Sequence, residues 1–414
     1  MVGPFSQSMT GRTLFLRGDL PSMSKLSERM NKRVAALSPS SILTFNQKIS
    51  TIPDIVKLTL GEPDFNTPEH VKQAAITSIE NNESHYTNSR GTIGLRKAAT
   101  GFLKQKYGLN YDPETQILIT AGATGAIYSA LTAMLNPGDT VIIPTPIFPL
   151  YIPIAMLGGA KPIFVDTSDN GFILSPEKLQ AAIEENKDTV KAVILNFPTN
   201  PTGVTYHKDD LQKLADVISQ YDIFCISDEI YSELTYDGTH VSMGSILPEQ
   251  TLVMNGVSKS HAMTGWRIGM ICGPADVITE IGKVSEFTIT SCTANAQAAA
   301  QEAFTNGLND AAPMRAEYLK RRDLLTAGLK KAGFTCPNPN GAFYIFAKIP
   351  AELNQNSVEF CYELAEKAKV AVIPGASFGP GGEGYVRISY AASEADLKKA
   401  VERIQKFVGE KASV

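Results

Sequence analysis

The sequence contains few cysteines, and no apolar run in it is long enough to cross a membrane. Its five cysteines are scattered, without a CxxC pair and without a histidine at metal-ligand spacing. We therefore expect neither a disulfide framework nor a zinc or other metal site, and this usage fits a reducing cytoplasm. The N-terminus also lacks a convincing apolar core of a signal peptide. These absences predict a cytoplasmic chain with no membrane-spanning segment.

An excess of one charge is missing as well. Lysine and arginine total 38 against 42 acidic residues, which gives a net charge of -4 at pH 7. Because there is no long basic run, neither nucleic acid nor an anionic membrane is an expected partner. No GxxxxGK[ST] motif occurs, so a nucleotide-binding P-loop is not supported. A small molecule or another protein is the better expectation.

The length and the pattern of the chain predict two domains. A chain of 414 residues exceeds the usual size of a single core. In its middle, short apolar strands alternate with helices of about 12 residues, which predicts an α/β fold with a largely parallel sheet covered on both faces. Later, a long helix and short strands predict a smaller α+β unit. The expected parts are a leader or an extension added for expression at 1–22, a helical N-terminal arm with part of the small domain at 23–66, a large domain at 67–304 and a small domain at 305–414.

Two helix starts are predicted from local signals. Thr67 is a good N-cap residue, and Pro68 after it suits the first helical position. Ser175 precedes Pro176 in the same way and is expected to cap the helix SPEKLQAAIEEN.

One lysine lies where a reactive group is expected. In the segment TLVMNGVSKSHAMTGWRIG, residues 251–269, an apolar strand leads into a turn that carries Ser258 and Lys259. A lysine forms an imine with an aldehyde only as the free amine, so it must be desolvated or lie near positive charge. Arg267, in the same turn, could supply that charge or bind a phosphate. Taken alone, the segment fits a solvated loop better.

Two turns that follow strands carry further polar groups. The turn AGATGA, residues 121–126, separates a strand from a helix, so its backbone N–H groups and the helix dipole offer an anion site. It does not match the GxGxxG of dinucleotide-binding turns, and an ordinary tight turn is an equal alternative. Asn200, in NFPTNPTG, follows another strand, at a place where asparagine usually just initiates a turn.

Two buried charges are also expected. Asp228 directly follows the apolar run IFCIS, and a buried carboxylate needs a cationic partner, whether structural or functional. Tyr231 follows shortly after and is expected nearby. Arg387 lies mid-strand in YVRISYA, where its guanidinium either pairs structurally or binds an anion such as a carboxylate. Together, an imine-forming lysine, an acid, a phosphate site and a carboxylate clamp are the parts needed to hold pyridoxal phosphate and an amino acid.

The chain resembles a known family, the class I aminotransferases among the fold-type-I pyridoxal-phosphate enzymes. The matching segments occur in family order from about Met23 to the C-terminus: GEPDF, YTNSRGTIGLR, AGATGAI, NFPTNPTG, SDEIYSEL, VSKSHAMTGWRIG, GAFYIF and YVRISYA. The chain is similar in particular to the bacterial members assigned to aromatic amino acids or to N-acetyl-diaminopimelate. This resemblance implies a homodimer with shared active sites.

The resemblance implies catalytic and substrate-binding roles. Lys259 would bind the cofactor aldehyde and, once displaced by substrate, move the proton between Cα and C4′. Asp228 would pair with the protonated pyridine nitrogen and so keep the ring able to accept electrons. Tyr231 and Asn200 would hydrogen-bond the phenolic oxygen. Arg387, helped by Asn200 and the backbone of Gly61, would hold the substrate α-carboxylate.

The same resemblance implies the remaining cofactor contacts. The residues that would grip the phosphate are Ala123, Thr124, Ser258 and Arg267. Tyr86 would reach the phosphate of the neighbouring subunit, and Phe148 would stack on the pyridine ring. Thr124 also replaces a lysine with which some aspartate-using relatives bind a distal carboxylate, so strict dicarboxylate specificity is not expected.

The expected activity is transfer of an amino group from an L-amino acid to 2-oxoglutarate by a ping-pong mechanism. The donor would be aromatic, N-acetyl-diaminopimelate or aspartate-like. Phe343 and Tyr344 could line the side-chain pocket or belong to the core, with core favoured for at least one. A C–S or β-lyase is the alternative, because the same carbanion can eliminate a β-substituent. A non-catalytic regulator on this fold would need a DNA-binding module, and no basic helix-turn-helix is recognisable.

Overall fold

The computed structural model describes residues 25–412, and its contacts divide this range after Ser38. The first unit contains two short helices, η1 (Ser27–Arg29) and α1 (Lys32–Ala35). The second unit begins at Pro39 and contains all the elements described below. No helix within residues 25–412 combines the length and the apolar character needed to cross a membrane. The extension predicted at residues 1–22 lies outside the described residues.

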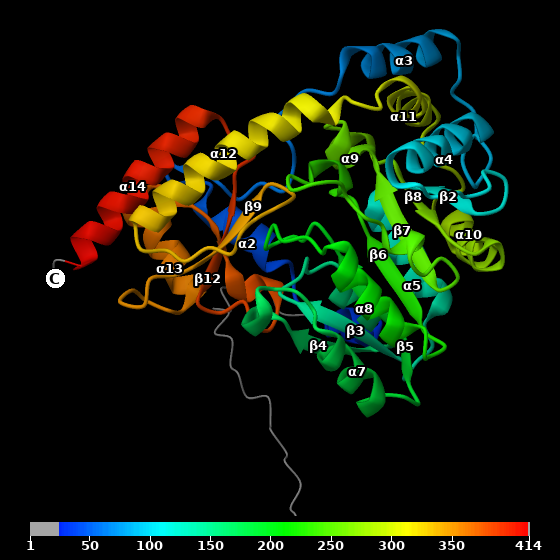
Figure 1. Ribbon diagram of the computed structural model, residues 1–414. Coiled ribbons are helices and arrows are strands. Elements are labelled where there is room, and N and C mark those ends of the chain that lie inside the picture. Colours follow the sequence, from blue (N-terminus) through cyan, green and yellow to red (C-terminus); the bar gives the residue numbers. More distant parts are fainter. Residues whose placement is uncertain (1–24, 413–414) are drawn as a thin grey trace, which may run out of the picture. The chain divides into compact units, whose positions relative to one another are not determined.

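A seven-stranded sheet is the largest sheet of the second unit (Figure 1). Its order is β2-β8-β7-β6-β5-β3-β4, and neighbours from β7 to β4 run parallel. Only β8 is reversed, antiparallel to both β2 and β7. The strands are β2 (Ile117–Thr120), β3 (Thr140–Thr145), β4 (Lys161–Asp166), β5 (Val190–Asn196), β6 (Phe224–Asp228), β7 (Thr251–Gly256) and β8 (Gly269–Cys272). The prediction of a mostly parallel sheet is confirmed, but the sequence pattern did not predict the reversal of β8.

Helices cover both faces of this sheet, because successive strand residues point to opposite sides. On one face, Leu118, Ile194 and Ile226 belong to a core shared with the helices α5 (Gly122–Met134), α6 (Tyr151–Leu157) and α10 (Ala275–Ile289). On the other face, residues such as Val193 pack with α7 (Pro176–Glu185) and α8 (Lys208–Ile218), and residues such as Ile117 pack with α4 (Ile93–Tyr107) and α11 (Ala294–Asn306). Helix α3 (Glu69–Glu80) packs outside α11.

A second group of elements, which comes from both ends of the second unit, contains short strands and long helices. Its sheets are an antiparallel one of order β11-β12-β9 and a parallel pair β1-β10, with β1 (Val56–Lys57), β9 (Tyr344–Lys348), β10 (Val370–Ala371), β11 (Ile373–Pro374) and β12 (Tyr385–Ser389). Its helices are α2 (Ser41–Ile49), α12 (Ala311–Lys331), α13 (Ser357–Glu363) and α14 (Glu394–Ala412), with α12 and α14 side by side (Figure 1). Phe45 and Leu58 share one core with residues from Met314 to Val408. The division into an N-terminal arm at 23–66, a large domain at 67–304 and a small domain at 305–414 stays a prediction.

Short helical turns connect these elements. They are η2 (Ser168–Asn170), η3 (Ser232–Leu234), η4 (Met243–Ser245), α9 (Val257–Ser260), η5 (Thr264–Trp266), η6 (Leu364–Ala368) and η7 (Gly375–Phe378).

One of the two predicted helix starts is confirmed, and the other is wrong by one residue. The Ser175 side chain caps α7 by accepting from the backbone N–H of Lys178, with proline at the first helical position. At α3 the N-cap is Pro68, without a side-chain hydrogen bond. The reason is that Thr67 Oγ1 is engaged elsewhere, because it donates to the carbonyl of Ala262 and accepts from Trp266 Nε1.

Candidate active site

A cavity of about 410 Å³ lies at the carboxyl ends of the parallel strands. Polar residues that follow β5, β6 and β7 converge there, because parallel strands end at one edge of a sheet. The predicted site residues that line it are Gly61, Ala123, Thr124, Phe148, Asn200, Asp228, Tyr231, Ser258, Lys259, Arg267 and Arg387. Of the predicted site residues, only Tyr86 is missing from this lining. The sequence prediction thus identified residues that are far apart in the chain but close together in the fold.

Lys259 projects from α9, the short helix directly after β7. Its Nζ donates a hydrogen bond to the carbonyl oxygen of Gly61. Burial lowers the pKa of this amine to about 8, with smaller contributions from the guanidinium groups of Arg267 and Arg387 and an opposing one from Glu62. A substantial fraction of the amine is therefore neutral near pH 8, as imine formation requires.

Asp228 ends β6, and its buried side chain forms part of the cavity wall. Tyr151 Oη donates to Oδ2 at 2.7 Å, and the backbone N–H of Ile230 donates to Oδ1 at 3.1 Å. Burial raises the pKa of this carboxyl to about 6, although both hydrogen bonds oppose the shift. Within residues 25–412 no cationic side chain forms an ion pair with Asp228, so a structural ion pair does not explain its burial.

Tyr151 is a site residue that the sequence reasoning missed. It lies at the start of α6, is fully buried, and touches the ring of Phe148 edge-on at 6.1 Å between centroids. In the sequence it belongs to the apolar run LYIPIAML and reads as an ordinary core aromatic residue. Its proximity to Asp228 depends on how α6 packs on the sheet, so only the spacing from Phe148 could have drawn attention to it.

Tyr231 is held by a second buried tyrosine. Its Oη lies 2.8 Å from Tyr344 Oη, and both rings are buried. Phe343 and Tyr344 are fully buried and do not line the cavity, so both belong to the core. Core packing, which was favoured for at least one of them, therefore holds for both. The ring of Phe343 also lies 5.8 Å from Lys259 Nζ, so a contact of either residue with the substrate side chain stays a prediction.

Arg387 is buried in β12, and none of the acidic side chains that the structure describes pairs with it. Its Nη1 donates to Asn200 Oδ1 at 2.9 Å, and its Nη2 donates to the Thr59 carbonyl at 2.8 Å. The guanidinium lies over the rings of Tyr344 and Phe378. Burial lowers its pKa, and its Nε has no hydrogen-bond partner among residues 25–412. A buried cation that contacts only neutral groups is suited to receive an anion.

The start of α5 offers a second place for an anion. Its N-cap, Ala121, provides no side-chain hydrogen bond, so the first-turn N–H groups, including those of Ala123 and Thr124, remain for a ligand. Gly122 has φ +70°, and a Cβ there would lie 2.4 Å from Arg267 Nη2. The guanidinium therefore rests directly on the helix start, where only glycine fits.

Phe148 and Tyr86, the two predicted aromatic contacts of the cofactor, differ in position. Phe148 lines the cavity next to Tyr151. Tyr86, in the connection between α3 and α4, is 87% exposed and does not contribute to this cavity. Its predicted contact with the neighbouring subunit remains untested.

Known proteins resemble this chain over nearly its whole length. Residues 53–404 match the family model described as aminotransferase class I and II. A probable N-acetyl-LL-diaminopimelate aminotransferase of Bacillus subtilis (strain 168) is 43% identical over 379 residues, which cover 92% of this chain and 95% of that protein. Aromatic-amino-acid aminotransferase 2 of Thermococcus litoralis is 37% identical over 391 residues, covering 93% and 100%. The solved aspartate aminotransferase from Thermus thermophilus with maleate is 39% identical, with a TM-score of 0.86 and coverage of 91% and 99%. With this fold, this cavity and these relatives, the chain belongs to the class I and II aminotransferases and is an enzyme of the transaminase class.

Proposed function

We propose that this enzyme binds pyridoxal phosphate and uses it to move an amino group from an L-amino acid to 2-oxoglutarate. The observation that carries the proposal is a set of unbalanced charges around one cavity. Within residues 25–412, Asp228 is a buried acid without a cation, and Arg387 is a buried cation without an acid. Lys259, between them, has a lowered pKa. Because isolated buried charges are costly, their persistence supports ligands that complete them.

The residues present fit pyridoxal phosphate. The first turn of α5, together with Ser258 and Arg267, would hold the phosphate through backbone N–H groups, a hydroxyl and a guanidinium. Asp228 would accept a hydrogen bond from the protonated ring nitrogen, and Phe148 would cover the ring. When bound, the cofactor supplies an aldehyde carbon and an electron-accepting ring.

The side chains of the site would then divide the proton transfers among them. Lys259 Nζ, neutral in part near pH 8, would take a proton from the substrate Cα and later return it. The Asp228 carboxylate would keep the ring nitrogen protonated, and Tyr151 would hold that carboxylate in place. Tyr231 Oη and the amide of Asn200 would donate to the phenolic oxygen.

Arg387 would orient the substrate. Its bond to Asn200 Oδ1 fixes one edge of the guanidinium, while Nε still lacks a partner among the described residues. The backbone of Gly61 borders the same space and would assist in holding the α-carboxylate. Fixing this carboxylate orients the Cα–H bond toward Lys259, which is the geometric requirement for proton transfer.

The amino donor would be aromatic, N-acetyl-diaminopimelate or aspartate-like. The printed names of the relatives support this range, because they include aminotransferases of all three kinds. Apolar side chains of Ile42, Leu43 and Leu60 border the cavity, and these suit an uncharged or mixed substrate side chain. Thr124 lies at the position where a lysine would favour a second carboxylate.

A homodimer with shared sites is part of the proposal. Large apolar side chains remain exposed on α3 and α10, including Ile79 at 57% and Phe287 at 90%, and a second copy of the chain would cover them. A cytoplasmic location is also proposed, because all five cysteines are free and four of them are buried.

The test is a panel of amino donors with 2-oxoglutarate, measured with wild-type enzyme and with Lys259→Ala. We expect keto-acid exchange in the wild type, with parallel initial-rate lines, and none in the variant. Full turnover by Lys259→Ala would refute the assignment of the lysine. Release of pyruvate from cystathionine without amino transfer would show elimination instead and would refute the transaminase cycle.

A further inference from the structure

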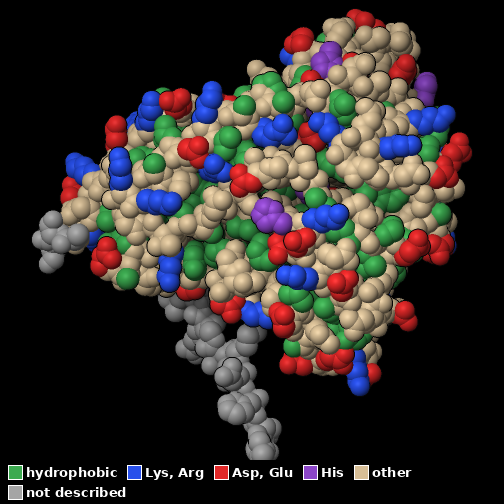
Figure 2. Space-filling view, viewed as in Figure 1, with side chains coloured by type: hydrophobic (Ala, Val, Ile, Leu, Met, Phe, Trp, Pro, Cys, Tyr) green, Lys and Arg blue, Asp and Glu red, His purple; other side chains and the backbone are tan. Residues whose placement is uncertain are grey.

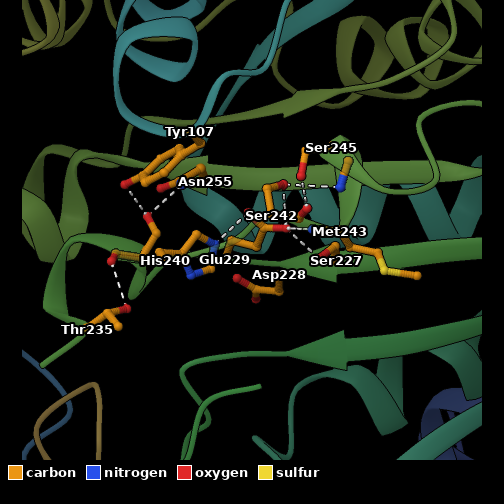
Figure 3. A network of polar contacts seen from close by, with 12 residues as sticks. Tyr107, Ser227, Asp228, Glu229, Thr235, His240, Ser242, Met243, Ser245 and Asn255 are labelled. Carbon is orange, nitrogen blue, oxygen red and sulfur yellow. Dashed lines mark hydrogen bonds and ion pairs between the residues drawn. The ribbon is translucent and has the colours of Figure 1, made fainter. Parts of the chain in front are cut away.

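A buried polar network lies behind Asp228, on the side away from the cavity. Because strand residues alternate in direction, Ser227 and Glu229 point opposite to Asp228 (Figure 3). Glu229 is completely buried. Its Oε1 accepts hydrogen bonds from Ser227 Oγ at 2.7 Å, Ser242 Oγ at 2.9 Å and the Met243 backbone N–H at 3.1 Å. This oxygen of the carboxylate thus accepts three hydrogen bonds, and none of the three donors lines the cavity.

The other oxygen of Glu229 meets a histidine. His240 Nε2 lies 2.9 Å from Oε2, and 1% of the His240 side chain is exposed. Its Nδ1 has no partner among residues 25–412. The neutral tautomer with hydrogen on Nε2 donates its one N–H to Glu229 and leaves no N–H unpaired, whereas an imidazolium would bury an unpaired N–H. The contact between the two residues is therefore a single hydrogen bond, between His240 Nε2 and Glu229 Oε2.

The network also contacts the segments that carry the other site residues. His240 stacks on Phe197, with centroids 5.4 Å apart, and Phe197 begins the loop that leads to Asn200. Tyr107 meets the His240 ring edge-on at 5.2 Å. Its hydroxyl lies 2.8 Å from Ser232 Oγ, in the residue after Tyr231.

These contacts tie down the strand end itself. The Glu229 backbone N–H donates to the Met254 carbonyl of β7 at 2.9 Å, which continues the sheet pairing one residue beyond Asp228. With its side chain held at four points, Glu229 has no freedom to rotate, and the peptide that joins it to Asp228 is fixed. The opposite direction of the Asp228 side chain follows from that fixed peptide.

We propose that the Glu229–His240 pair is a positioning device that holds Asp228 toward the cavity, where the proposed function places the cofactor ring nitrogen. The inference rests on that proposed function. A purely structural role is a weaker account, because burying an ionised carboxylate is costly and apolar residues stabilise such a position at least as well. The contribution of the pair is one of position and not of charge. Burial raises the pKa of Asp228, and the negative charge of Glu229 adds to this rise, so that charge opposes the ionised form that the ring nitrogen requires.

The test measures how strongly the protein recognises the ring nitrogen. Dissociation constants of the cofactor-free protein are determined for pyridoxal phosphate and for its 1-deaza analogue, in which carbon replaces that nitrogen. The ratio of the two constants reports the contact of Asp228 and not the general integrity of the pocket. We expect the wild type to prefer pyridoxal phosphate by about tenfold or more, as for loss of a charge-assisted hydrogen bond.

In Glu229→Gln and His240→Phe this preference should fall at least fivefold, while affinity for the deaza analogue changes little. Ser242→Ala, which removes one of the four hydrogen bonds and keeps the charge, should lower the preference by about twofold and applies if the other variants do not fold. Ser245→Ala is the matched control, because Ser245 Oγ binds the Ser242 carbonyl and not Glu229. An unchanged ratio in folded variants would overturn this inference alone. A wild type without any preference would instead overturn the proposed role of Asp228.

Discussion

Replacing Asp228 by asparagine should stabilise the cofactor-free protein at neutral pH while impairing its function. The carboxyl is buried, it lacks an ion-pair partner within residues 25–412, and burial raises its pKa from 3.8 to about 6. Relative to the unfolded chain, the folded protein therefore favours the protonated acid. Asparagine has a similar shape and cannot ionise, so Asp228→Asn removes the cost of burying an ionised side chain.

The magnitude follows from the shift in pKa. A change from 3.8 to about 6 corresponds to about 3 kcal/mol in the free energy of unfolding. Since the folded pKa is the higher one, the stabilising contribution of protonated Asp228 is fully present below about pH 3.8 and is lost as the pH rises through about 6. Relative to the wild type, Asp228→Asn should gain less than about 1 kcal/mol near pH 4 and about 3 kcal/mol near pH 8.

Urea unfolding of cofactor-free wild type and Asp228→Asn, followed between pH 4 and pH 8, measures this difference. Asp216→Asn is the control, since Asp216 is exposed on α8 and should show no comparable trend. Two results would refute the reasoning: a stability difference that does not grow with pH, or a wild type that is the more stable protein at pH 8. Either one would mean that another group compensates the charge of Asp228.

The other predictions concern single side chains of the site. Borohydride reduction with pyridoxal phosphate should label Lys259. The labelling should be half complete near pH 8, because burial lowers the pKa of this amine to about 8, and peptide mapping that found another lysine would contradict this. Arg387→Lys should lower kcat/KM about 10- to 150-fold, the cost of about 1.5–3 kcal/mol for a hydrogen bond to a charged group; unchanged steady-state kinetics would exclude the carboxylate clamp. Tyr151→Phe should raise the pKa of Asp228 further, because the hydroxyl lowers it. As the pH is lowered, the cofactor affinity of Tyr151→Phe, measured by fluorescence, should therefore begin to fall at a higher pH than that of the wild type, and an unshifted profile would count against the hydrogen bond. Tyr86→Phe should leave thermal stability unchanged, since the residue is exposed, but weaken cofactor binding in the dimer; equal affinity would remove Tyr86 from the site.

Much of the sheet was predictable because its signals are local. Short apolar strands alternate with amphipathic helices, and this pattern requires a parallel sheet with both faces covered. The cap at Ser175 depends on one neighbouring turn and was correct. Thr67 failed as a cap because tertiary partners, Ala262 and Trp266, engage its hydroxyl. The reversal of β8 depends on which strands lie beside it, and no local pattern carries that information.

The candidate site was predictable where charge interrupts an apolar strand or follows one. Asp228, Lys259 and Arg387 stand out in this way, and the parallel topology then brings strand ends together. Tyr151 and His240 did not stand out, because each looks like an ordinary residue until the fold places it against a carboxylate.

The amine of Lys259 and the guanidinium of Arg267 belong to one short connection between β7 and β8, whose ends are fixed by antiparallel pairing of Gly256 with Gly269. Their separation is consequently a local property of that loop, independent of movements elsewhere in the chain. Insertions and deletions that surface loops accept should be intolerable here, since one added residue would misalign the proposed phosphate ligand, Arg267, with the proposed aldehyde ligand, Lys259. In a library of insertions and deletions across this protein, active variants with a changed length at 257–268 should therefore be absent.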